Sequence, residues 1–225
     1  MRPTGFVVAV ERTPTSGSPR AVLDAGLAAA AVELDEAARA ALIRYVELLA
    51  RWNRAYNLTA VRAPREMVRR HLLDSVVILP YVHGRRLLDV GTGAGLPGLV
   101  VALARPELEC VLIDSSAKKI RFCRQAVGEL RLANVEVVHA RIQEYRPARP
   151  FDTVVARAFG RLGELLAQAE RLCAPGGRLL AMKGKAPRAE LADLGALQER
   201  TRVVPLRVPG LDARRELVIV PCGPG

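Results

Sequence analysis

The sequence of 225 residues has few of the side chains that build metal sites and disulfide frameworks. It contains four cysteines and three histidines, and the cysteines form no C-x-x-C pair and have no neighbouring histidine. A zinc site is therefore not expected, nor any other metal centre. Three cysteines stand in apolar stretches, and we interpret them as small buried thiols, as expected in a reducing cytoplasm. The four are Cys110, Cys123, Cys173 and Cys222.

Long apolar runs are also missing. No run approaches the ~18 apolar residues of a membrane span. The one apolar block near the start, residues 6–10, is shorter than the ~7–15 residues of a secretory signal core. These absences predict a cytoplasmic protein with no membrane partner. Residues 1–19 carry prolines, serines and Gly17 without a periodic pattern, so we expect a disordered tail there.

Lysine is scarce as well, at four positions, whereas arginine is abundant. Together the two number 34 against 23 acidic residues, which gives a formal net charge of +11. A charge of this size favours a polyanionic partner such as a nucleic acid. The alternative is a compositional bias toward arginine, spread over solvent-exposed faces. The charge alone leaves both explanations open.

Glycine is concentrated in one stretch. Residues 87–98 have the sequence LLDVGTGAGLPG, an apolar run that leads into alternate glycines and then into an apolar, alanine-bearing segment. This pattern predicts a strand, a glycine loop and a helix. Glycines at 91, 93 and 95 allow positive φ and close approach of a ligand. Pro97 suits the first turn of the helix, whose free amides favour an anionic group. The loop is therefore predicted to hold a small molecule.

The loop has three interpretations, two of which name a ligand. Residues 93–98 match G-x-G-x-x-G, which allows a dinucleotide enzyme, although a lone match is weak. Asp89, two residues before the first glycine, argues against it, because residues 89–95 resemble motif I of methyltransferases that use S-adenosylmethionine (SAM). A turn without any ligand is the third interpretation, but a structural turn rarely needs four glycines in eight residues.

The part before residue 84 is expected to be a helical extension, residues 20–83. One helix carries the apolar stripe Leu42, Ile43, Val46 and Leu49. A second helix follows Pro64, with Met67, His71 or Leu72, and Val76 turned inward and Arg62, Arg65 and Arg69 on another face. Between them lies segment 51–59, which holds Trp52 and Tyr56. If exposed, it suits base stacking, and if buried, its aromatic rings are core anchors, the role we favour for Trp52.

Residues 84–225 are expected to form an α/β domain. Short apolar runs alternate with helical stretches, which is typical of a parallel sheet with helices on both faces. The expected strands are 86–90, 109–113, 135–139, 153–156, 178–182, 202–208 and 216–220, and the expected helices are 96–104, 117–130, 161–173 and 188–199. The last two strands are joined by residues 209–212, too few for a crossover helix, so they should pair antiparallel. Seven strands with a final hairpin fit a class I, Rossmann-like SAM-dependent methyltransferase better than a six-stranded dinucleotide fold.

Ligands of such sheets bind at the carboxyl ends of the strands. Asp114 follows the second strand, about 20 residues after the loop, where an acid accepts hydrogen bonds from ribose hydroxyls. It could equally cap the next helix, and both roles are compatible. Ile142 and Gln143 follow the third strand, at the position of an adenine. Arg157 follows the fourth strand and Lys183 the fifth, which places cations at the mouth of the site. For Arg157 we favour a functional role over a surface ion pair.

Six segments together resemble the family of bacterial small-subunit rRNA guanine-N7 methyltransferases, also called glucose-inhibited division protein B. They are NLTAV (57–61), RHLLDS (70–75), DVGTGAGLPG (89–98), RF (121–122), ARAF (156–159) and MKG (182–184). The resemblance covers about residues 41–220. It implies methyl transfer from SAM to N7 of one guanine in the decoding-region hairpin, the 530 loop, of 16S rRNA. The partner would be 16S rRNA or the small ribosomal subunit, and we expect a monomer.

The loop motif, the basic residues and the resemblance together predict site residues, and the resemblance itself implies the cofactor contacts Gly91, Leu96, Asp114, Ile142, Gln143 and Arg157. The expected cofactor contacts are Asp89, Gly91, Gly93, Gly95, Leu96, Asp114, Ile142, Gln143 and Arg157. The expected RNA contacts are Asn57, Arg65, Arg69, His71 and Lys183, where His71 and Asn57 could instead serve packing. No catalytic acid or base is assigned. Two other functions stay open: a methyltransferase of the same fold for a small molecule or protein, and a dinucleotide-dependent oxidoreductase.

Overall fold

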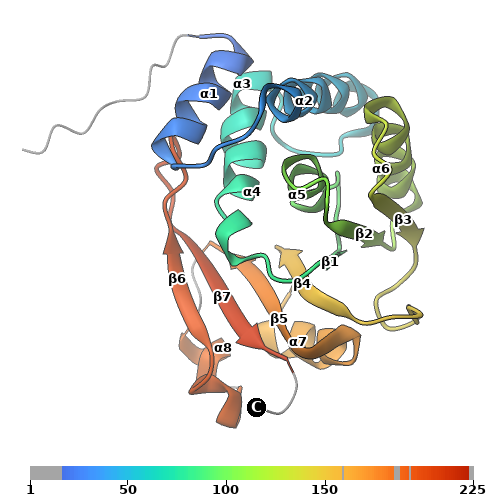
Figure 1. Ribbon diagram of the computed structural model, residues 1–225, viewed down its shortest axis with the longest axis vertical. Coiled ribbons are helices and arrows are strands. Elements are labelled where there is room, and N and C mark those ends of the chain that lie inside the picture. Colours follow the sequence, from blue (N-terminus) through green and yellow to red (C-terminus); the bar gives the residue numbers. More distant parts are fainter. Residues whose placement is uncertain (1–16, 159, 185–187, 193, 223–225) are drawn as a thin grey trace, which may run out of the picture.

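The computed structural model describes residues 17–158, 160–184, 188–192 and 194–222 (Figure 1). Its centre is a seven-stranded sheet of order β3-β2-β1-β4-β5-β7-β6. The strands are β1 (Arg86–Val90), β2 (Glu109–Asp114), β3 (Val135–His139), β4 (Phe151–Arg157), β5 (Cys173–Lys183), β6 (Arg202–Leu206) and β7 (Arg215–Pro221). The first five are parallel, and β7 runs antiparallel to both β5 and β6. The predicted seven strands and the final antiparallel hairpin are confirmed.

Helices cover both faces of the sheet, as predicted (Figure 1). One face carries α1 (Pro19–Ala29), α2 (Glu36–Tyr56), α5 (Gly98–Ala104) and α6 (Ala117–Leu130), and the other carries α7 (Leu162–Ala169) and α8 (Arg188–Ala192). Side chains of β1 alternate between the layers: Leu87 packs with α5, whereas Leu88 and Val90 pack with α7. In the described part of the chain, no helix has the length and apolarity of a membrane span.

The N-terminal helices begin at side-chain caps. The Ser18 hydroxyl accepts a hydrogen bond from the amide of Ala21 at the start of α1, and the Asp35 carboxylate accepts one from Ala38 at the start of α2. Residues 18 and 19, predicted to belong to a disordered tail, are instead the N-cap and the first residue of α1, while residues 1–16 lie outside the described residues.

The buried face of α2 joins the extension to the sheet domain. Leu42, Val46 and Leu49 are buried, as the apolar stripe predicted, and Ile43 is partly buried. They belong to one core cluster with residues of α5 and α6. Each fully buried leucine contributes about 2 kcal/mol. The helical extension and the sheet therefore share a core.

The segment after Pro64 is not one regular α-helix. It consists of α3 (Pro64–Met67), a π-helical segment (Val68–Leu73) and α4 (Asp74–Val76), followed by a 3₁₀ turn (Leu79–Tyr81). Met67, Leu72 and Val76 are buried as predicted. Arg69, however, does not share an exposed face with Arg65: its side chain is 12% exposed and pairs with Glu66 at 2.6 Å. A π-helical turn contains an extra residue, so it shifts the faces expected from α-helical spacing.

Several predicted boundaries need correction. The helix after the glycine loop begins at Gly98 and not at residue 96, and Pro97, whose peptide bond with Leu96 is cis, is its N-cap. The predicted helix 161–173 is α7 plus a 3₁₀ turn (Glu170–Leu172), because β5 already begins at Cys173. The predicted helix 188–199 is α8 and a 3₁₀ turn (Gly195–Gln198), and residue 193 lies outside the described residues. The predicted strand 202–208 ends at residue 206.

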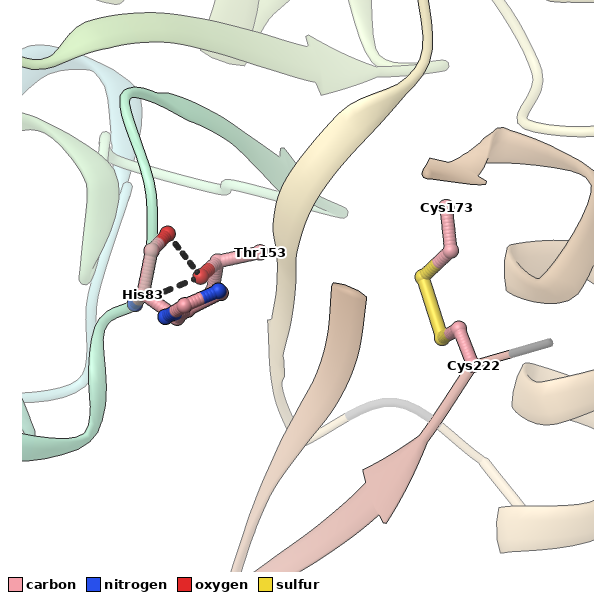
Figure 2. Close-up of a disulfide and its surroundings, with 4 residues drawn as sticks. All are labelled: His83, Thr153, Cys173 and Cys222. Atoms are coloured by element: carbon pink, nitrogen blue, oxygen red, sulfur yellow. Dashed lines mark hydrogen bonds between the residues drawn. A yellow bond between two sulfur atoms is a disulfide. The ribbon is translucent and has the colours of Figure 1, made fainter. Parts of the chain in front are cut away.

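The interpretation of three cysteines as buried thiols holds for two residues only. Cys110 and Cys123 are buried free thiols, and burial raises the pKa of both well above the ordinary value. Cys173 and Cys222 form a disulfide with a Cα–Cα distance of 6.0 Å (Figure 2). The antiparallel pairing of β5 and β7 places the start of one strand beside the end of the other, across 49 residues of sequence. Spacing along the chain could not reveal this proximity.

Candidate functional site

The glycine loop has the backbone that its sequence predicted. Gly91, Gly93 and Gly95 have φ values of 65°, 62° and 84°, a region that side chains disfavour. A Cβ on Gly95 would also collide with the side chain of Leu99. The loop turns tightly, since the amides of Gly95 and Leu96 both donate to the carbonyl of Thr92. Glycine is therefore required here by conformation and by space.

Asp89 lies beneath this loop and is fully buried. Its Oδ2 accepts hydrogen bonds from Thr92 Oγ1 at 2.5 Å and from the Gly98 amide at 2.8 Å. Burial raises the pKa of Asp89 to about 6, although both hydrogen bonds oppose the shift. The predicted anion site at the start of α5 is wrong in this respect, because the Gly98 amide is engaged by Asp89. Asp89 joins the two ends of the loop.

Asp114, the last residue of β2, supports the loop from the other side. Its Oδ2 accepts from the Gly93 amide at 3.0 Å and its Oδ1 from the Ser116 amide at 2.8 Å, while Lys119 Nζ lies 3.6 Å away. The N-cap of α6 is Ser116, so Asp114 holds the turn before the helix and is not itself the cap. Asp114 is 7% exposed.

A first cavity of about 200 Å³ opens at the carboxyl ends of β1, β2 and β3. It is lined by Val90, Gly91, Ile113, Asp114, Ser115, Ala140, Arg141, Ile142 and Gln143. Four predicted cofactor contacts meet here: Gly91, Asp114, Ile142 and Gln143. The buried Leu96 lies in the adjoining loop and does not line this cavity.

A second cavity of about 430 Å³ lies between the N-terminal segment and the ends of β4 and β5. It is lined by Val61, Arg70, His71, Asp74, Arg157, Ala158, Met182, Lys183, Gly184 and Arg215. The structure thus brings together the predicted His71, Arg157 and Lys183. Asn57, Arg65 and Arg69 do not line it. Phe159 and Lys185, in or beside the quoted motifs, lie outside the described residues.

Asp74 pairs with two arginines that line the second cavity. Its carboxylate, 3% exposed as a residue, accepts from Arg215 Nε at 2.9 Å and lies 3.4 Å from Arg157 Nη1. A buried carboxylate needs such partners to offset its desolvation. Arg157 is therefore both an ion-pair partner and a cavity residue. Arg215 was missed by sequence reasoning, because it stands 141 residues from Asp74 and in no motif.

His71 has both ring nitrogens engaged within the protein. Nδ1 lies 2.9 Å from the Arg70 carbonyl, and Nε2 lies 2.9 Å from Thr59 Oγ1. A carbonyl only accepts, so Nδ1 carries the proton and Nε2 accepts from the Thr59 hydroxyl. Burial, aided by the charge of Arg157, lowers the pKa of His71 to about 4. This neutral side chain forms part of the cavity wall.

Lys183 is held in a similar way. Its Nζ donates to the Gly160 carbonyl at 2.7 Å and pairs with Glu190 at 2.9 Å. Glu190 also accepts from the Leu162 amide, at the start of α7. Lys183 therefore fixes the segment after β4 while it lines the cavity.

The loop 57–61 carries the remaining N-terminal motif. Asn57 is exposed, adopts φ 48° at the end of α2 and accepts from Arg62 Nη2 at 3.4 Å. The loop is anchored by the buried Asn53, whose side chain binds the Thr59 amide and the Val61 carbonyl. Sequence reasoning missed Asn53, although a polar residue on the buried face of a helix is a recognisable signal.

The two aromatic residues of this region have different environments. Trp52 is partly buried and packs edge-on against Phe122, with ring centroids 5.7 Å apart. Tyr56 stacks on Trp52 at 5.0 Å and is 38% exposed. The core role favoured for Trp52 is confirmed.

A family model described as rRNA small subunit methyltransferase G matches residues 38–218. The chain is 51% identical over 197 residues to the ribosomal RNA small subunit methyltransferase G of Nitrosococcus oceani, covering 88% of this chain and 92% of that protein. It is 53% identical over 196 residues to the protein of the same name from Alkalilimnicola ehrlichii, covering 87% and 89%. A SAM-dependent O-methyltransferase structure from Thermotoga maritima matches with TM-score 0.53 and 16% identity, covering 68% and 66%, a similarity of fold alone.

Proposed function

This chain belongs to the rRNA small subunit methyltransferase G family, and from that premise we propose that it methylates N7 of one guanine in the decoding-region hairpin of 16S rRNA. It is a SAM-dependent methyltransferase of small-subunit rRNA. The observation that carries the finer proposal is the pair of cavities at one edge of the sheet, one beside the glycine loop and one beside the N-terminal segment.

The first cavity fits SAM. Gly91 presents no side chain to it, Asp114 offers a carboxylate for ribose hydroxyls, and Ile142 offers an apolar surface for adenine. Gln143 is proposed to contact the edge of the adenine. Gly93, Gly95 and Leu96 are proposed to lie along the methionine portion of SAM. Asp89 holds the loop through its hydrogen bonds. Arg157, in the second cavity, is the proposed partner of the methionine carboxylate.

Methyl transfer to N7 depends on the alignment of the reacting atoms more than on proton transfer. SAM supplies a methyl group on a sulfonium, and guanine N7 has an in-plane lone pair and no proton to remove. Alignment of acceptor, carbon and sulfur can then supply a large rate gain. No base is needed, in keeping with a buried Asp89 and a His71 whose nitrogens are both engaged.

The second cavity suits the charge that develops during transfer. Positive charge leaves the sulfur and appears on the purine ring, so unpaired cations beside the ring would oppose the reaction. Asp74 lies between Arg157 and Arg215 and offsets part of their charge. We propose that this arrangement lets arginines line the cavity without destabilising a methylated guanine.

The RNA must present the base outside a regular helix. N7 lies on an edge that A-form RNA hides in a deep groove, so the guanine comes from a loop or is extruded at a cost of a few kcal/mol. We assign RNA contacts to Asn57, Arg65, Arg69, His71 and Lys183. Asn57 and Arg65 are exposed and suited to phosphates, whereas the other three act from partly or fully buried positions. The active form is proposed to be a monomer.

The test is methyl incorporation from labelled SAM into small subunits from cells that lack this enzyme, with the modified base mapped. The proposal predicts a single N7-methylguanine in the decoding-region hairpin. Methylation at another atom of guanine would overturn the N7 assignment, and methylation of another rRNA nucleotide would overturn the hairpin assignment, but both results would keep the family. SAM binding without transfer to subunits or naked rRNA would favour a small-molecule or protein substrate.

A further inference from the structure

Tyr45 of α2 contacts the glycine loop directly. Its hydroxyl donates a hydrogen bond of 2.7 Å to the carbonyl of Ala94, which stands between Gly93 and Gly95. Tyr45 is fully buried and Ala94 is 6% exposed, so water does not readily replace either partner. Burial raises the pKa of Tyr45 well above its ordinary value, which keeps the hydroxyl protonated as a donor. The bond joins the helical extension to the loop across 49 residues of sequence.

The loop has other side-chain contacts, but they come from the sheet domain. Asp114 accepts from the Gly93 amide, and the Cys123 thiol donates to the Gly93 carbonyl at 3.5 Å. Tyr45, which belongs to the helical extension, contacts the next carbonyl, that of Ala94. The tip of the loop is thus held between α2 on one side and β2 with α6 on the other.

The ring that carries this hydroxyl is itself fixed. Tyr45 packs against Phe122 of α6 with ring centroids 6.2 Å apart, and Phe122 in turn contacts Trp52 at 5.7 Å. Such aromatic contacts contribute about 0.5–1.5 kcal/mol each beyond the buried area. They align α2 with α6, and the hydroxyl therefore remains within reach of Ala94.

We propose that Tyr45 is a positioning residue for SAM, which holds the glycine loop in its binding conformation before the cofactor arrives. The inference rests on the SAM site proposed above. Glycine-rich backbone has many accessible conformations, and affinity falls in proportion to the fraction of molecules that is competent to bind. The N-terminal helices are therefore part of the cofactor site as well as a surface for RNA.

The test compares Tyr45→Phe with the wild-type chain and with Thr153→Val. Tyr45→Phe removes the hydroxyl and keeps the ring. Thr153→Val is the matched control, because the buried Thr153 hydroxyl donates to the His83 carbonyl at 2.7 Å and accepts from its amide at 2.9 Å (Figure 2). This control lies near the amino end of β4, whereas the cavities are at the carboxyl ends.

The readouts are the dissociation constant of S-adenosylhomocysteine by calorimetry and the unfolding free energy in urea. Tyr45→Phe is expected to raise the dissociation constant about three- to tenfold, the size of one hydrogen bond. Thr153→Val should lower stability yet leave the dissociation constant within about twofold of wild type. A dissociation constant that is unchanged in Tyr45→Phe, or raised equally in both variants, overturns the proposal.

A second measurement needs no variant. In the free wild-type chain, hydrogen exchange should already be slow at the amides of Gly95 and Leu96, which donate to Thr92, and the cofactor product should add little protection. Fast exchange in the free chain that becomes slow only on binding contradicts a preformed loop. If the wild-type chain does not bind S-adenosylhomocysteine at all, the SAM site itself fails, an outcome distinct from failure of the Tyr45 role.

Discussion

The two cavities at the carboxyl edge of the sheet are built in different ways. The first is made by the ends of three neighbouring parallel strands, and its lining holds one arginine, Arg141, and one carboxylate, Asp114. The second joins the N-terminal segment to β4, β5 and β7, and it is lined by Arg70, Asp74, Arg157, Lys183 and Arg215. The proposed cofactor site therefore follows from local motifs, whereas the proposed substrate site depends on residues that are far apart in sequence.

The cavities also differ in what stabilises them. Around the first, Asp89 and Asp114 bind mainly backbone amides and a hydroxyl, which fixes the loop. Around the second, Asp74 pairs with two arginines, which fixes the N-terminal segment against the sheet. Changes in the first region should therefore act on cofactor affinity, and changes in the second on stability and RNA.

The largest expected effect is at Asp74. Asp74→Asn leaves Arg157 and Arg215 without a counter-charge, and removal of one partner from a buried ion pair costs about 3 kcal/mol. The unfolding free energy in urea measures this loss. Glu66→Gln is the matched control, because Glu66 also pairs with two arginines but its side chain is 40% exposed, and the expected cost is below about 1 kcal/mol. Equal costs for the two variants would show that the Asp74 cluster has no special role.

Acid should act on the two regions with opposite sign. The pKa of His71 is about 4 when folded, below its ordinary 6.5, so the unfolded chain binds the proton more readily and stability falls as pH drops from 6.5 toward 4. The pKa of Asp89 is about 6 when folded, above its ordinary 3.8, so the folded chain binds the proton more readily and stability rises as pH drops through 6.

The variant His71→Gln separates these contributions. Between pH 7 and pH 5 the wild type should lose about 2 kcal/mol more stability than His71→Gln, a figure that follows from the two His71 pKa values. Urea unfolding of both chains at both pH values measures the difference between the two losses. Equal losses in the two chains would mean that His71 is not held neutral by its surroundings.

A smaller effect is expected at Asp114. Asp114→Asn weakens the charge-assisted hydrogen bonds to the loop and those proposed for the ribose, so the dissociation constant of S-adenosylhomocysteine should rise about tenfold. The KM for rRNA should change little. Calorimetry and steady-state kinetics provide the two readouts. An effect on the KM for rRNA alone would remove Asp114 from the cofactor site.

The smallest effect is expected at Arg65. Arg65→Gln removes one exposed cation, so the KM for rRNA should rise a few-fold and the salt slope of RNA binding should fall by about 1. Cofactor affinity should stay the same. Arg149→Gln is the control, since Arg149 is an exposed arginine beside the amino end of β4, paired with Glu109. If both variants weaken RNA binding equally, the basic charge acts without a preferred face.

Local signals in the sequence were sufficient to predict most of the first cavity and the glycine loop beside it. The glycine loop and Ile142 each follow a strand within a few residues, Asp114 is the last residue of β2, and parallel strands end at one edge. The sequence could not reveal that Arg215 meets Asp74 or that Cys222 meets Cys173, because both contacts depend on where β7 lies in the sheet. The exposure of Arg69 was mispredicted because helical spacing does not anticipate a π-helical segment. Tyr45 was indistinguishable from an ordinary core residue.

The central claim is that the first cavity binds SAM and the second binds the guanine. Its most direct test is a crystal structure of the chain with S-adenosylhomocysteine. We expect the adenosine in the first cavity, with the ribose hydroxyls against Asp114, the adenine over Ile142, and the sulfur directed toward the second cavity. A product molecule bound in the second cavity, or remote from the glycine loop, would contradict this account.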